Sequence, residues 1–496
     1  MPQSLHVSEQ PFKDSRVGII DIGSNSIRLV IYDQLKRSPV PIYNEKVMCA
    51  LGKGLAKTGM LSPEGVKMAR DTLRRFLAMG RNMEITTLYV IATAAVREAT
   101  DGVHFTRELE KEHDIDIEVI SGKREARLGA YGVCSSMHQP HGITGDLGGG
   151  SLELVYMDNG MIEDHTSLPL GGLRMIDETG GDREKIRALV DKNFNGLSWL
   201  HNKEIENFYA IGGGFRALAR IHMTLNQYPL QILHQYEVDA SEFYSFAQEI
   251  VTMKESALAK LPGVAQKRLH QLPGAALVLQ NIIQHCRPES IIFSGSGIRE
   301  GYFYEKLSPY TRQQDGLLTS CTEFITKGGR SPAYANELFE WMSPLLTGED
   351  ESLQRLRMAF CLLSDIALHI HPSYRADWAY HRILFSALNG LSHHQRVKLS
   401  LALYHRYNFK LKSSWPTLDL LDEKDRHWAR LTGTMANLAY HLTGNIAGTL
   451  QHSSISVKEG KVKLQLDDSI RDTMGDAVQK RVDGVQEAFE GYKGTR

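Results

Sequence analysis

The sequence lacks a long apolar run. No stretch of its 496 residues approaches the roughly 20 apolar residues of a membrane-spanning helix, and the N-terminal segment lacks the apolar core of a signal peptide. An excess of one charge is also missing, because 57 Lys and Arg stand against 58 Asp and Glu. A nearly neutral chain gives no argument for a nucleic-acid partner, so any basic binding surface must be local. These absences predict a cytoplasmic protein without a membrane span.

Cysteine is scarce as well. The five cysteines are odd in number, lie far apart and form no CxxC pair, which argues against a disulfide framework. We therefore expect reduced core residues at Cys49, Cys134, Cys286, Cys321 and Cys361. With 42% hydrophobic and 23% charged residues, the composition is that of an ordinary globular protein, and the length predicts two to four domains.

An internal repeat is the most informative feature that is present. The repeat aligns residues 20–33, IDIGSNSIRLVIYD, with residues 145–158, GDLGGGSLELVYMD, and six positions are identical. Each copy has an apolar run that ends in Asp, a turn rich in Gly, Ser or Asn, and a second apolar run, which is typical of a β-hairpin. Two such hairpins suggest two related halves that face each other across a cleft.

The turn of each hairpin indicates phosphate chemistry. Its small residues expose successive backbone N–H groups that can cradle an anionic phosphate. A single turn of this kind has a structural explanation, because a tight hairpin needs glycine, but the duplicated form is much more specific. The candidate phosphate-binding residues are Gly23, Ser24, Asn25, Ser26, Gly148, Gly149, Gly150 and Ser151.

Acidic residues flank these turns. Asp21 and Asp146 come just before them, where a carboxylate can hold a divalent cation directly or through water. Glu153 follows the second turn, at the place where the first hairpin has Arg28. Strand alternation puts Asp146 and Glu153 close enough to share one ion. An exposed strand glutamate is the alternative interpretation of Glu153.

The segment between the hairpins has the alternation of an α/β fold. A helical pattern at 63–82 precedes a buried strand that ends just before Arg97, where a guanidinium can reach into a cleft and bind phosphate oxygens. A second strand and a Ser-Gly turn lead to a helix that begins near Glu125, whose carboxylate is a candidate general base for water. The alternatives are a solvated surface arginine and a glutamate that the helix dipole favours.

Five motifs resemble those of the exopolyphosphatase and guanosine-pentaphosphate phosphohydrolase family, within the superfamily of actin and the sugar kinases. They span residues 17 to about 305 and read DIGSNSIRLVI, ATAAVREA, VISGKREARLGAYGV, GDLGGGSLELV and SGSGIREG. The resemblance implies an α/β fold with two actin-like, ribonuclease-H-like domains around a cleft, at 16–128 and 129–310. It also implies an α-helical HD-like region at 311–496 with a small α+β tail.

The resemblance further implies roles for the candidate residues. Glu125 would be the general base and Arg97 a phosphate clamp. Asp146 and Glu153 would hold Mg²⁺, and Asp21 is a third candidate ligand from its position. Water would attack the terminal phosphorus of inorganic polyphosphate or of a guanosine polyphosphate, and orthophosphate would leave. A homodimer is the implied assembly.

Three departures from the family pattern stand out. Arg124 lies where members often carry an acid before the base, so we expect a lower pKa for the base. The loop at 210–220 reads Gly-Gly-Gly-Phe in place of the usual Gly-x-Ser-Gly-Thr, which puts its phosphate role in doubt. The His-Asp pair of HD-type metal sites appears as Ser364 and Asp365, so we expect no second metal centre there.

Helical periodicity dominates the C-terminal third. A basic stretch within it is open to two interpretations, a track for a long polyanion or a plain solvated helix face. Its cations are Arg396, Lys398, Arg406, Lys410 and Lys412. The tail predicts a hairpin around Glu459 and Gly460, followed by a polar helix.

Exopolyphosphatase is the favoured function, because an extra helical region could hold many phosphate units. A guanosine-pentaphosphate phosphohydrolase would need the same site but a shorter substrate. An actin-like kinase or ATPase would need an adenosine pocket that nothing in the sequence demands. A non-catalytic alarmone sensor is hard to reconcile with the intact acids Glu125, Asp146 and Glu153.

Overall fold

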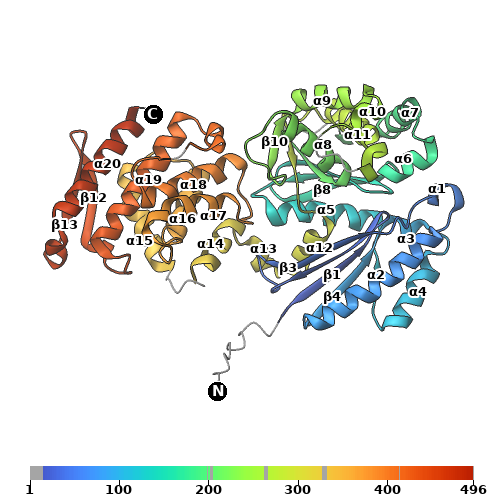
Figure 1. Cartoon of the computed structure of the whole chain (residues 1–496), viewed down its shortest axis with the longest axis horizontal. Coiled ribbons are helices and arrows are strands. Elements are labelled where there is room, and N and C mark those ends of the chain that lie inside the picture. The colour runs from blue at the N-terminus through green and yellow to red at the C-terminus, as the bar shows by residue number, and fades with distance from the viewer. Residues whose placement is uncertain are drawn as a thin grey trace, which may run out of the picture. The chain divides into compact units, whose positions relative to one another are not determined.

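The computed structural model of the protein describes residues 15–197, 199–200, 205–261, 266–326, 332–412 and 414–494 (Figure 1). The chain forms two compact units that divide between Gln314 and Asp315. Within the described ranges, no helix has both the length and the apolar character that crossing a membrane requires. All five cysteines are buried, in agreement with their expected place in the core.

The first unit begins with five strands, β1 (Val17–Ile22), β2 (Ser26–Tyr32), β3 (Pro41–Met48), β4 (Thr87–Ala92) and β5 (Glu118–Val119). They form a sheet in the order β3-β2-β1-β4-β5. The pairs β1–β2 and β2–β3 are antiparallel, whereas β1–β4 and β4–β5 are parallel. The first predicted hairpin is therefore β1–β2, and its continuation in parallel strands fits the predicted α/β fold.

A second sheet repeats this arrangement with β6 (Gly142–Leu147), β7 (Leu152–Asp158), β8 (Met161–Leu168), β9 (Asn207–Gly212), β10 (Tyr236–Asp239) and β11 (Ser290–Phe293). Its order is β8-β7-β6-β9-β11-β10. The first five of these strands have the same parallel and antiparallel pairs as β3-β2-β1-β4-β5, and β10 is an added antiparallel edge. The duplicated topology confirms the two actin-like domains.

The helices of the first unit cover both faces of each sheet (Figure 1). They are α1 (Leu55–Thr58), α2 (Pro63–Asn82), α3 (Ala94–Glu98), α4 (Gly102–His113), α5 (Gly122–Ser136), α6 (Gly172–Thr179), α7 (Arg183–Phe194), α8 (Gly213–Leu225), α9 (Ala240–Thr252), α10 (Glu255–Leu258), the 3₁₀ turn η2 (Gln266–Gln271), α11 (Leu272–Cys286), α12 (Ile298–Lys306) and α13 (Pro309–Gln313). The predicted helix at 63–82 is α2, which begins after Ser62 because the Ser62 hydroxyl accepts from the backbone N–H of Gly65.

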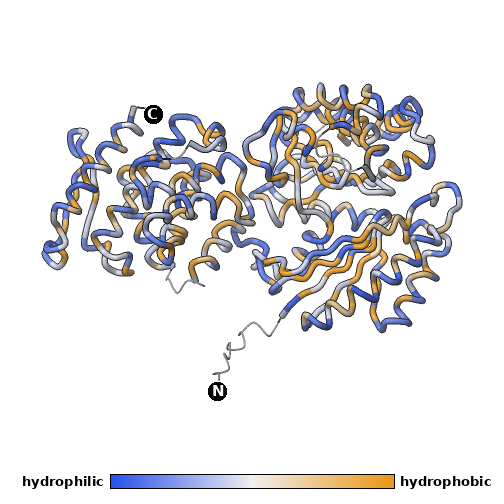
Figure 2. Tube along the Cα trace, viewed as in Figure 1, coloured by the Kyte–Doolittle hydropathy of each residue, from blue (hydrophilic) through white to orange (hydrophobic). Residues whose placement is uncertain are grey.

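The helices α5 and α12 form a layer between the two sheets. Tyr302 and Phe303 of α12 pack with β1 and β2, whereas Ala130 and Val133 of α5 pack with β7 and β9. Figure 2 shows the hydrophobic residues concentrated along the strands that these helices cover. The expected boundary between residues 128 and 129 lies inside α5, so this helix is continuous where the sequence suggested a division.

Glycines allow α5 and α12 to cross at close range. A Cβ atom on Gly301 would lie 1.7 Å from the carbonyl oxygen of Leu128, and one on Gly132 would lie 2.3 Å from the carbonyl oxygen of Gly297. No side chain fits at either position without moving backbone. The crossing holds the N-terminal turn of α5, which carries Glu125, beside the second sheet.

The second unit is mainly helical, as expected. Its elements are α14 (Gly316–Thr326), α15 (Pro332–Met342), η3 (Ser343–Leu345), α16 (Glu351–Leu363), η4 (Pro372–Tyr374), α17 (Arg375–Leu384), α18 (His393–Tyr407), η5 (Pro416–Leu420), α19 (Glu423–Thr443), η6 (Leu450–His452), β12 (Ser453–Lys458), β13 (Lys461–Leu466), η7 (Asp468–Thr473) and α20 (Asp476–Gly494). The predicted tail hairpin is β12–β13, and Glu459 and Gly460 both have positive φ in its two-residue turn.

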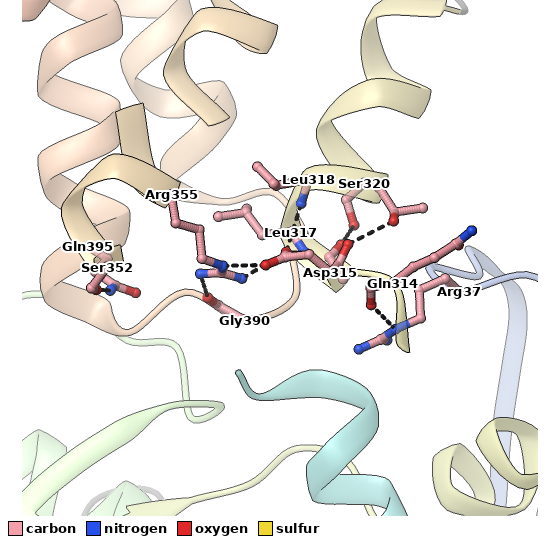
Figure 3. Close-up of polar contacts among 12 residues, drawn as sticks. Arg37, Gln314, Asp315, Leu317, Leu318, Ser320, Ser352, Arg355, Gly390 and Gln395 are labelled. Atoms are coloured by element: carbon pink, nitrogen blue, oxygen red, sulfur yellow. Dashed lines mark hydrogen bonds and ion pairs between the residues drawn. The ribbon is translucent and has the colours of Figure 1, made fainter. Parts of the chain in front are cut away.

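The residues at the junction are each held within their own unit (Figure 3). In the first unit, Arg37 donates to the carbonyl oxygens of Gln314 and Ser135. In the second unit, Asp315 accepts from two backbone N–H groups at the start of α14 and from both Nε and Nη2 of Arg355. The stretch between the units is therefore very short.

The basic stretch of the second unit is largely internal. Arg396 and Lys398 are 3% and 8% exposed; Arg396 donates to backbone carbonyls, and the Lys398 ammonium lies 2.6 Å from the Asp425 carboxylate. Arg406 is 2% exposed and pairs with Asp365 at 3.3 Å. These three cations are buried and have partners inside the unit. They therefore form neither a solvated helix face nor an open track for a polyanion. The Arg406 guanidinium thus neutralises the charge of Asp365.

Candidate active site

The two glycine-rich turns have the same local geometry. In the first hairpin, the backbone N–H of Gly23 donates to the carbonyl of Ser26 at 3.0 Å. In the second, the N–H of Gly148 donates to the carbonyl of Ser151 at 2.9 Å. The two predicted hairpins therefore share this turn hydrogen bond as well as their sequence pattern.

The two turns also face each other. A Cβ atom on Gly149 would lie 3.0 Å from the Ser24 Cβ, and one on Gly150 would lie 3.4 Å from the Ser24 hydroxyl oxygen. A cavity of about 160 Å³ lies at this contact, and its lining includes Ser24, Gly149, Gly150, Ala94, Glu98 and Arg174. Small residues on both sides let the backbone approach a ligand closely.

Two acidic side chains of the second hairpin lie side by side. Asp146 on β6 is the direct cross-strand partner of Glu153 on β7, so both carboxylates lie on one face of the sheet. Glu153 is 2% exposed, and its Oε1 accepts from the Ser167 hydroxyl at 2.9 Å. Among the residues that the structure describes, neither Asp146 nor Glu153 makes an ion pair with a basic side chain.

Glu125 joins these acids from the first turn of α5. The helix begins where the Ser121 hydroxyl accepts from the backbone N–H of Arg124. Glu125 is 5% exposed, and its Oε2 accepts from Nη1 of Arg97 at 2.8 Å. The same Arg97 nitrogen donates to the carbonyl of Ile120 at 2.9 Å, which fixes the guanidinium at the end of β5.

The pKa values of the three acids rise together. Burial raises the pKa of Glu125 to about 7 and that of Asp146 to about 6, and the nearby carboxylates add to both increases. Burial and Glu125 raise the pKa of Glu153 well above its ordinary value. Arg97 opposes the increase at Glu125. Burial is therefore the main reason why these three acids favour their neutral forms.

The expectation that Arg124 would lower the pKa of the base is wrong. The Arg124 guanidinium turns away from the site and pairs with Glu118 at 3.0 Å and with Glu305 at 2.8 Å. Burial, which favours the neutral carboxyl, dominates at Glu125 instead.

A divalent cation fits the acidic pair. No group of three or more His, Cys, Asp or Glu side chains within the described ranges is arranged to hold a metal ion. Mg²⁺, however, usually takes only one or two carboxylates and completes its shell with water and substrate phosphate oxygens. Asp146 and Glu153 supply such a pair, and a bound cation would lower the pKa values that burial raises at both.

Asp21 is placed differently from Asp146. Its direct cross-strand partner is Arg28, and its Oδ2 accepts from Nη1 of Arg299 on α12 at 2.8 Å. Asp21 is close enough to Asp146 and Glu125 to raise the pKa of both. Asp21 thus lies near the acidic pair but does not form a three-carboxylate group with it, and an arginine already pairs with Asp21.

The loop after β9 has a structural reason for its glycines. Gly212 has φ of 99°, and a Cβ atom there would lie 2.3 Å from the carbonyl oxygen of Leu147. The carbonyl oxygens of Gly212 and Gly295 accept from Arg216, whose charge lowers the pKa of Asp146 against the effect of burial. The start of α8 therefore places a half-buried guanidinium near the acidic pair.

Sequence reasoning missed several members of the site. Arg299 lies in the SGSGIREG motif, but its partner Asp21 is 278 residues away along the chain. Ser167 has no motif of its own, although it lies opposite Glu153 in the β7–β8 ladder. Arg174 bridges the cleft to Glu98 at 2.9 Å, and only the fold reveals that contact.

Comparison with known proteins assigns both units. A model described as "Ppx/GppA phosphatase family" matches residues 9–309, and a model described as "Exopolyphosphatase, C-terminal" matches residues 317–494. Retrograde regulation protein 2 of Saccharomyces cerevisiae is 24% identical over 92% of this chain and 86% of that protein. Guanosine-5'-triphosphate,3'-diphosphate pyrophosphatase of Aeromonas hydrophila is 25% identical over 79% of this chain and 81% of that protein.

Solved structures show the same fold. An exopolyphosphatase from Cytophaga hutchinsonii superposes with a TM-score of 0.54 and 25% identity, over 58% of this chain and 97% of that one. The Ppx/GppA family member of Aquifex aeolicus superposes with a TM-score of 0.51 and 22% identity, over 59% of this chain and 99% of that one. Since the first family model covers more than half of the sequence and its motifs converge on one acidic cleft, the chain belongs to the Ppx/GppA phosphatase family.

Proposed function

We propose that this protein is an exopolyphosphatase, which hydrolyses the terminal phosphoanhydride of inorganic polyphosphate and releases orthophosphate. The observation that carries the proposal is the contact between the two glycine-rich turns next to Glu125, Asp146 and Glu153. Backbone N–H groups from both turns would hold the terminal phosphates, and no other described part of the site combines donors and acids in this way.

Glu125 is the proposed general base. Its carboxylate takes the proton of a water molecule whose oxygen forms a bond to the terminal phosphorus, while the bond to the bridging oxygen breaks and the shortened chain leaves. A pKa near the working pH suits this role, because the group must be deprotonated before attack and still bind a proton during it. Arg97 holds the carboxylate in place and lies where it can also bind a phosphate oxygen.

Asp146 and Glu153 are the proposed ligands of Mg²⁺, with Asp21 as a third, outer candidate. The cation would neutralise phosphate charge as it develops at the leaving oxygen. The hydroxyl groups of Ser167 and Ser151 both hydrogen-bond with the Glu153 carboxylate, which holds it in place. The cytoplasmic location that the sequence predicts and the homodimer that the family resemblance implies belong to this proposal as well.

Guanosine pentaphosphate is the second candidate substrate. The Aeromonas hydrophila relative, by its name, acts on a guanosine 5'-triphosphate that carries a 3'-diphosphate. Such a substrate presents the same terminal phosphoanhydride, so the acids and turns would do the same work. The two substrates differ in the groups that follow the second phosphate, and not in the bond that is hydrolysed.

A substrate panel tests the proposal. Purified protein with Mg²⁺ should release orthophosphate from long-chain polyphosphate, and Glu125→Gln should reduce turnover by about 10²–10⁴-fold while binding persists. The exposed Glu289 offers a matched Glu→Gln control that should act as wild type. Release from guanosine pentaphosphate alone would favour the second candidate, and release from neither would overturn both.

A further inference from the structure

A second cavity lies beside α5, on the side of the helix away from Glu125. It has a volume of about 750 Å³, and its lining comes mainly from α5, β8 and α13. Lys123, Arg124, Arg127, Arg312 and His165 supply its polar lining, together with Glu163. This volume falls in the range of ordinary ligand sites, which is roughly 300–1,000 Å³.

The cations of α5 share one face of the helix. With roughly 3.6 residues per turn, Lys123, Arg124 and Arg127 lie within about 100° of one another, and Glu125 points the other way. Arg312 of α13 and His165 of β8 complete the lining from the other elements. Helix α5 therefore directs Glu125, the proposed general base, toward the catalytic acids and directs its cations toward the cavity.

Neighbouring acids position two of these cations but leave two others unpaired. Glu305 accepts from Arg124 at 2.8 Å and from Arg127 at 2.7 Å, which fixes both guanidiniums along the wall. Among the residues that the structure describes, Lys123 and Arg312 make no ion pair. Both therefore have their full charge to offer to an anion.

The cavity ends next to the catalytic site. Ser121, the N-cap of α5, lines the cavity, and a Cβ atom on the following Gly122 would lie 3.2 Å from the Ser167 hydroxyl and 3.9 Å from Nη2 of Arg97. Ser167 donates to Glu153, and Arg97 donates to Glu125. The start of α5 therefore packs between the catalytic acids and the cavity, and an extended anion held at the acids would pass over it to reach the cavity.

We propose that this cavity is a distal anion site, which binds inner phosphates of an inorganic phosphate chain whose terminal phosphate lies at Glu125. The inference rests on the proposed function and adds the location of the remainder of the substrate. The lining favours phosphate over a purine base, because the Tyr304 ring already has the Arg37 guanidinium 5.3 Å above it and Tyr131 beside it. Lysine and arginine side chains without a carboxylate partner can donate to the phosphate oxygens of a chain that has no base.

The test compares two triple variants of the full-length protein. The cavity variant carries Lys123→Gln, Arg127→Gln and Arg312→Gln, and none of these residues belongs to the catalytic site. The control variant carries Arg81→Gln, Arg107→Gln and Lys111→Gln, which remove the same charge from exposed helix positions outside the cavity. Glutamine keeps the helix propensity of all six positions.

Long-chain polyphosphate and tripolyphosphate are the kinetic probes. We expect the KM for the long chain to rise about tenfold in the cavity variant, and to depend less on salt, because fewer phosphate contacts release counterions. The KM for tripolyphosphate, and kcat for both, should match wild type and the control variant. An unchanged long-chain KM overturns the proposal, and so does an equal rise with tripolyphosphate or a rise with guanosine pentaphosphate alone.

A binding arm separates this inference from the proposed function. In a Glu125→Gln background, fluorescence anisotropy measures the Kd for labelled long-chain polyphosphate without turnover. A roughly tenfold weaker Kd on adding the cavity substitutions supports the distal site, and an unchanged Kd overturns it. Absence of orthophosphate release by the wild type would overturn the proposed function instead, and the binding comparison would still decide the fate of the cavity.

Discussion

Nη1 of Arg97 lies 2.8 Å from Oε2 of Glu125. The arginine follows a strand of the first sheet, whereas the glutamate begins a helix that packs on the second sheet, so the contact joins the two halves of the cleft. Arg97 lowers the pKa of Glu125 against the larger effect of burial. The arginine therefore helps to keep the proposed base ready to accept a proton at neutral pH.

Replacing Arg97 by Met should separate its two roles. Loss of the charge should raise the pKa of Glu125 further, so the acidic limb of the pH profile of kcat/KM should move to higher pH. Loss of a phosphate contact should lower kcat/KM by about 10²-fold at neutral pH. A profile that keeps its midpoint would show that Arg97 does not control the base. The exposed Arg81, changed to Met, is the matched control.

The stability of the metal-free protein should fall as pH rises through the acid cluster. Glu125 has a pKa of about 7 in the folded chain against 4.5 as its ordinary value, so the folded state binds more protons between these two values. Unfolding in urea with EDTA should show a free energy of unfolding lower at pH 8 than at pH 5 by about 2 kcal/mol from this group. In Glu125→Gln, the free energy of unfolding should depend less steeply on pH. A slope of opposite sign in the difference between the two proteins would contradict the assignment.

Magnesium binding should depend on Glu153. In Glu153→Gln, the affinity measured by calorimetric titration should fall by at least about tenfold, because a neutral amide replaces one of two carboxylates. The thermal stabilisation that Mg²⁺ gives should fall in parallel. The control is Glu289→Gln, on the surface of the same unit. Full Mg²⁺ affinity in Glu153→Gln would remove this residue from the proposed ligands.

Asp21 should matter more for stability than for metal binding. Asp21→Asn leaves the buried guanidinium of Arg299 with only the more distant Glu300 carboxylate, at 3.9 Å, which should cost up to about 3 kcal/mol of unfolding free energy in chemical denaturation. Its effect on Mg²⁺ affinity should be smaller than that of Asp146→Asn. If the two variants lose Mg²⁺ affinity equally, Asp21 is a direct ligand. The double variant with Arg299→Met should recover part of the lost stability, since it removes the buried charge that has lost its hydrogen-bonded partner.

Much of the site could be predicted because its parts lie close together in the sequence. A hairpin brings Asp146 and Glu153 together through local strand alternation, so their placement follows from seven residues of spacing. The tail hairpin was predicted in the same way, because an alternating strand pattern lies on both sides of Glu459 and Gly460, and both residues take the positive φ of a two-residue turn. The family resemblance supplied the rest of the fold.

Contacts between distant segments could not be predicted in this way. The ion pair of Asp21 with Arg299 depends on how α12 packs against β1, and no local pattern encodes that packing. The direction of Arg124 likewise depends on Glu305, which lies 181 residues further along the chain. Arg396 and Lys398 read as surface cations because sequence patterns assume that charge faces water, whereas their partners lie inside the unit.

The junction between the two units has a practical consequence. Gln314 and Asp315 are neighbours in the chain, yet Arg37 holds the carbonyl of the first and Arg355 binds the carboxylate of the second (Figure 3). If the chain were divided at this peptide bond, each new terminus would keep its own contact, Gln314 with Arg37 and Asp315 with Arg355. Separate expression of 1–314 and 315–496 is therefore the natural way to ask what each half of the gene product does alone.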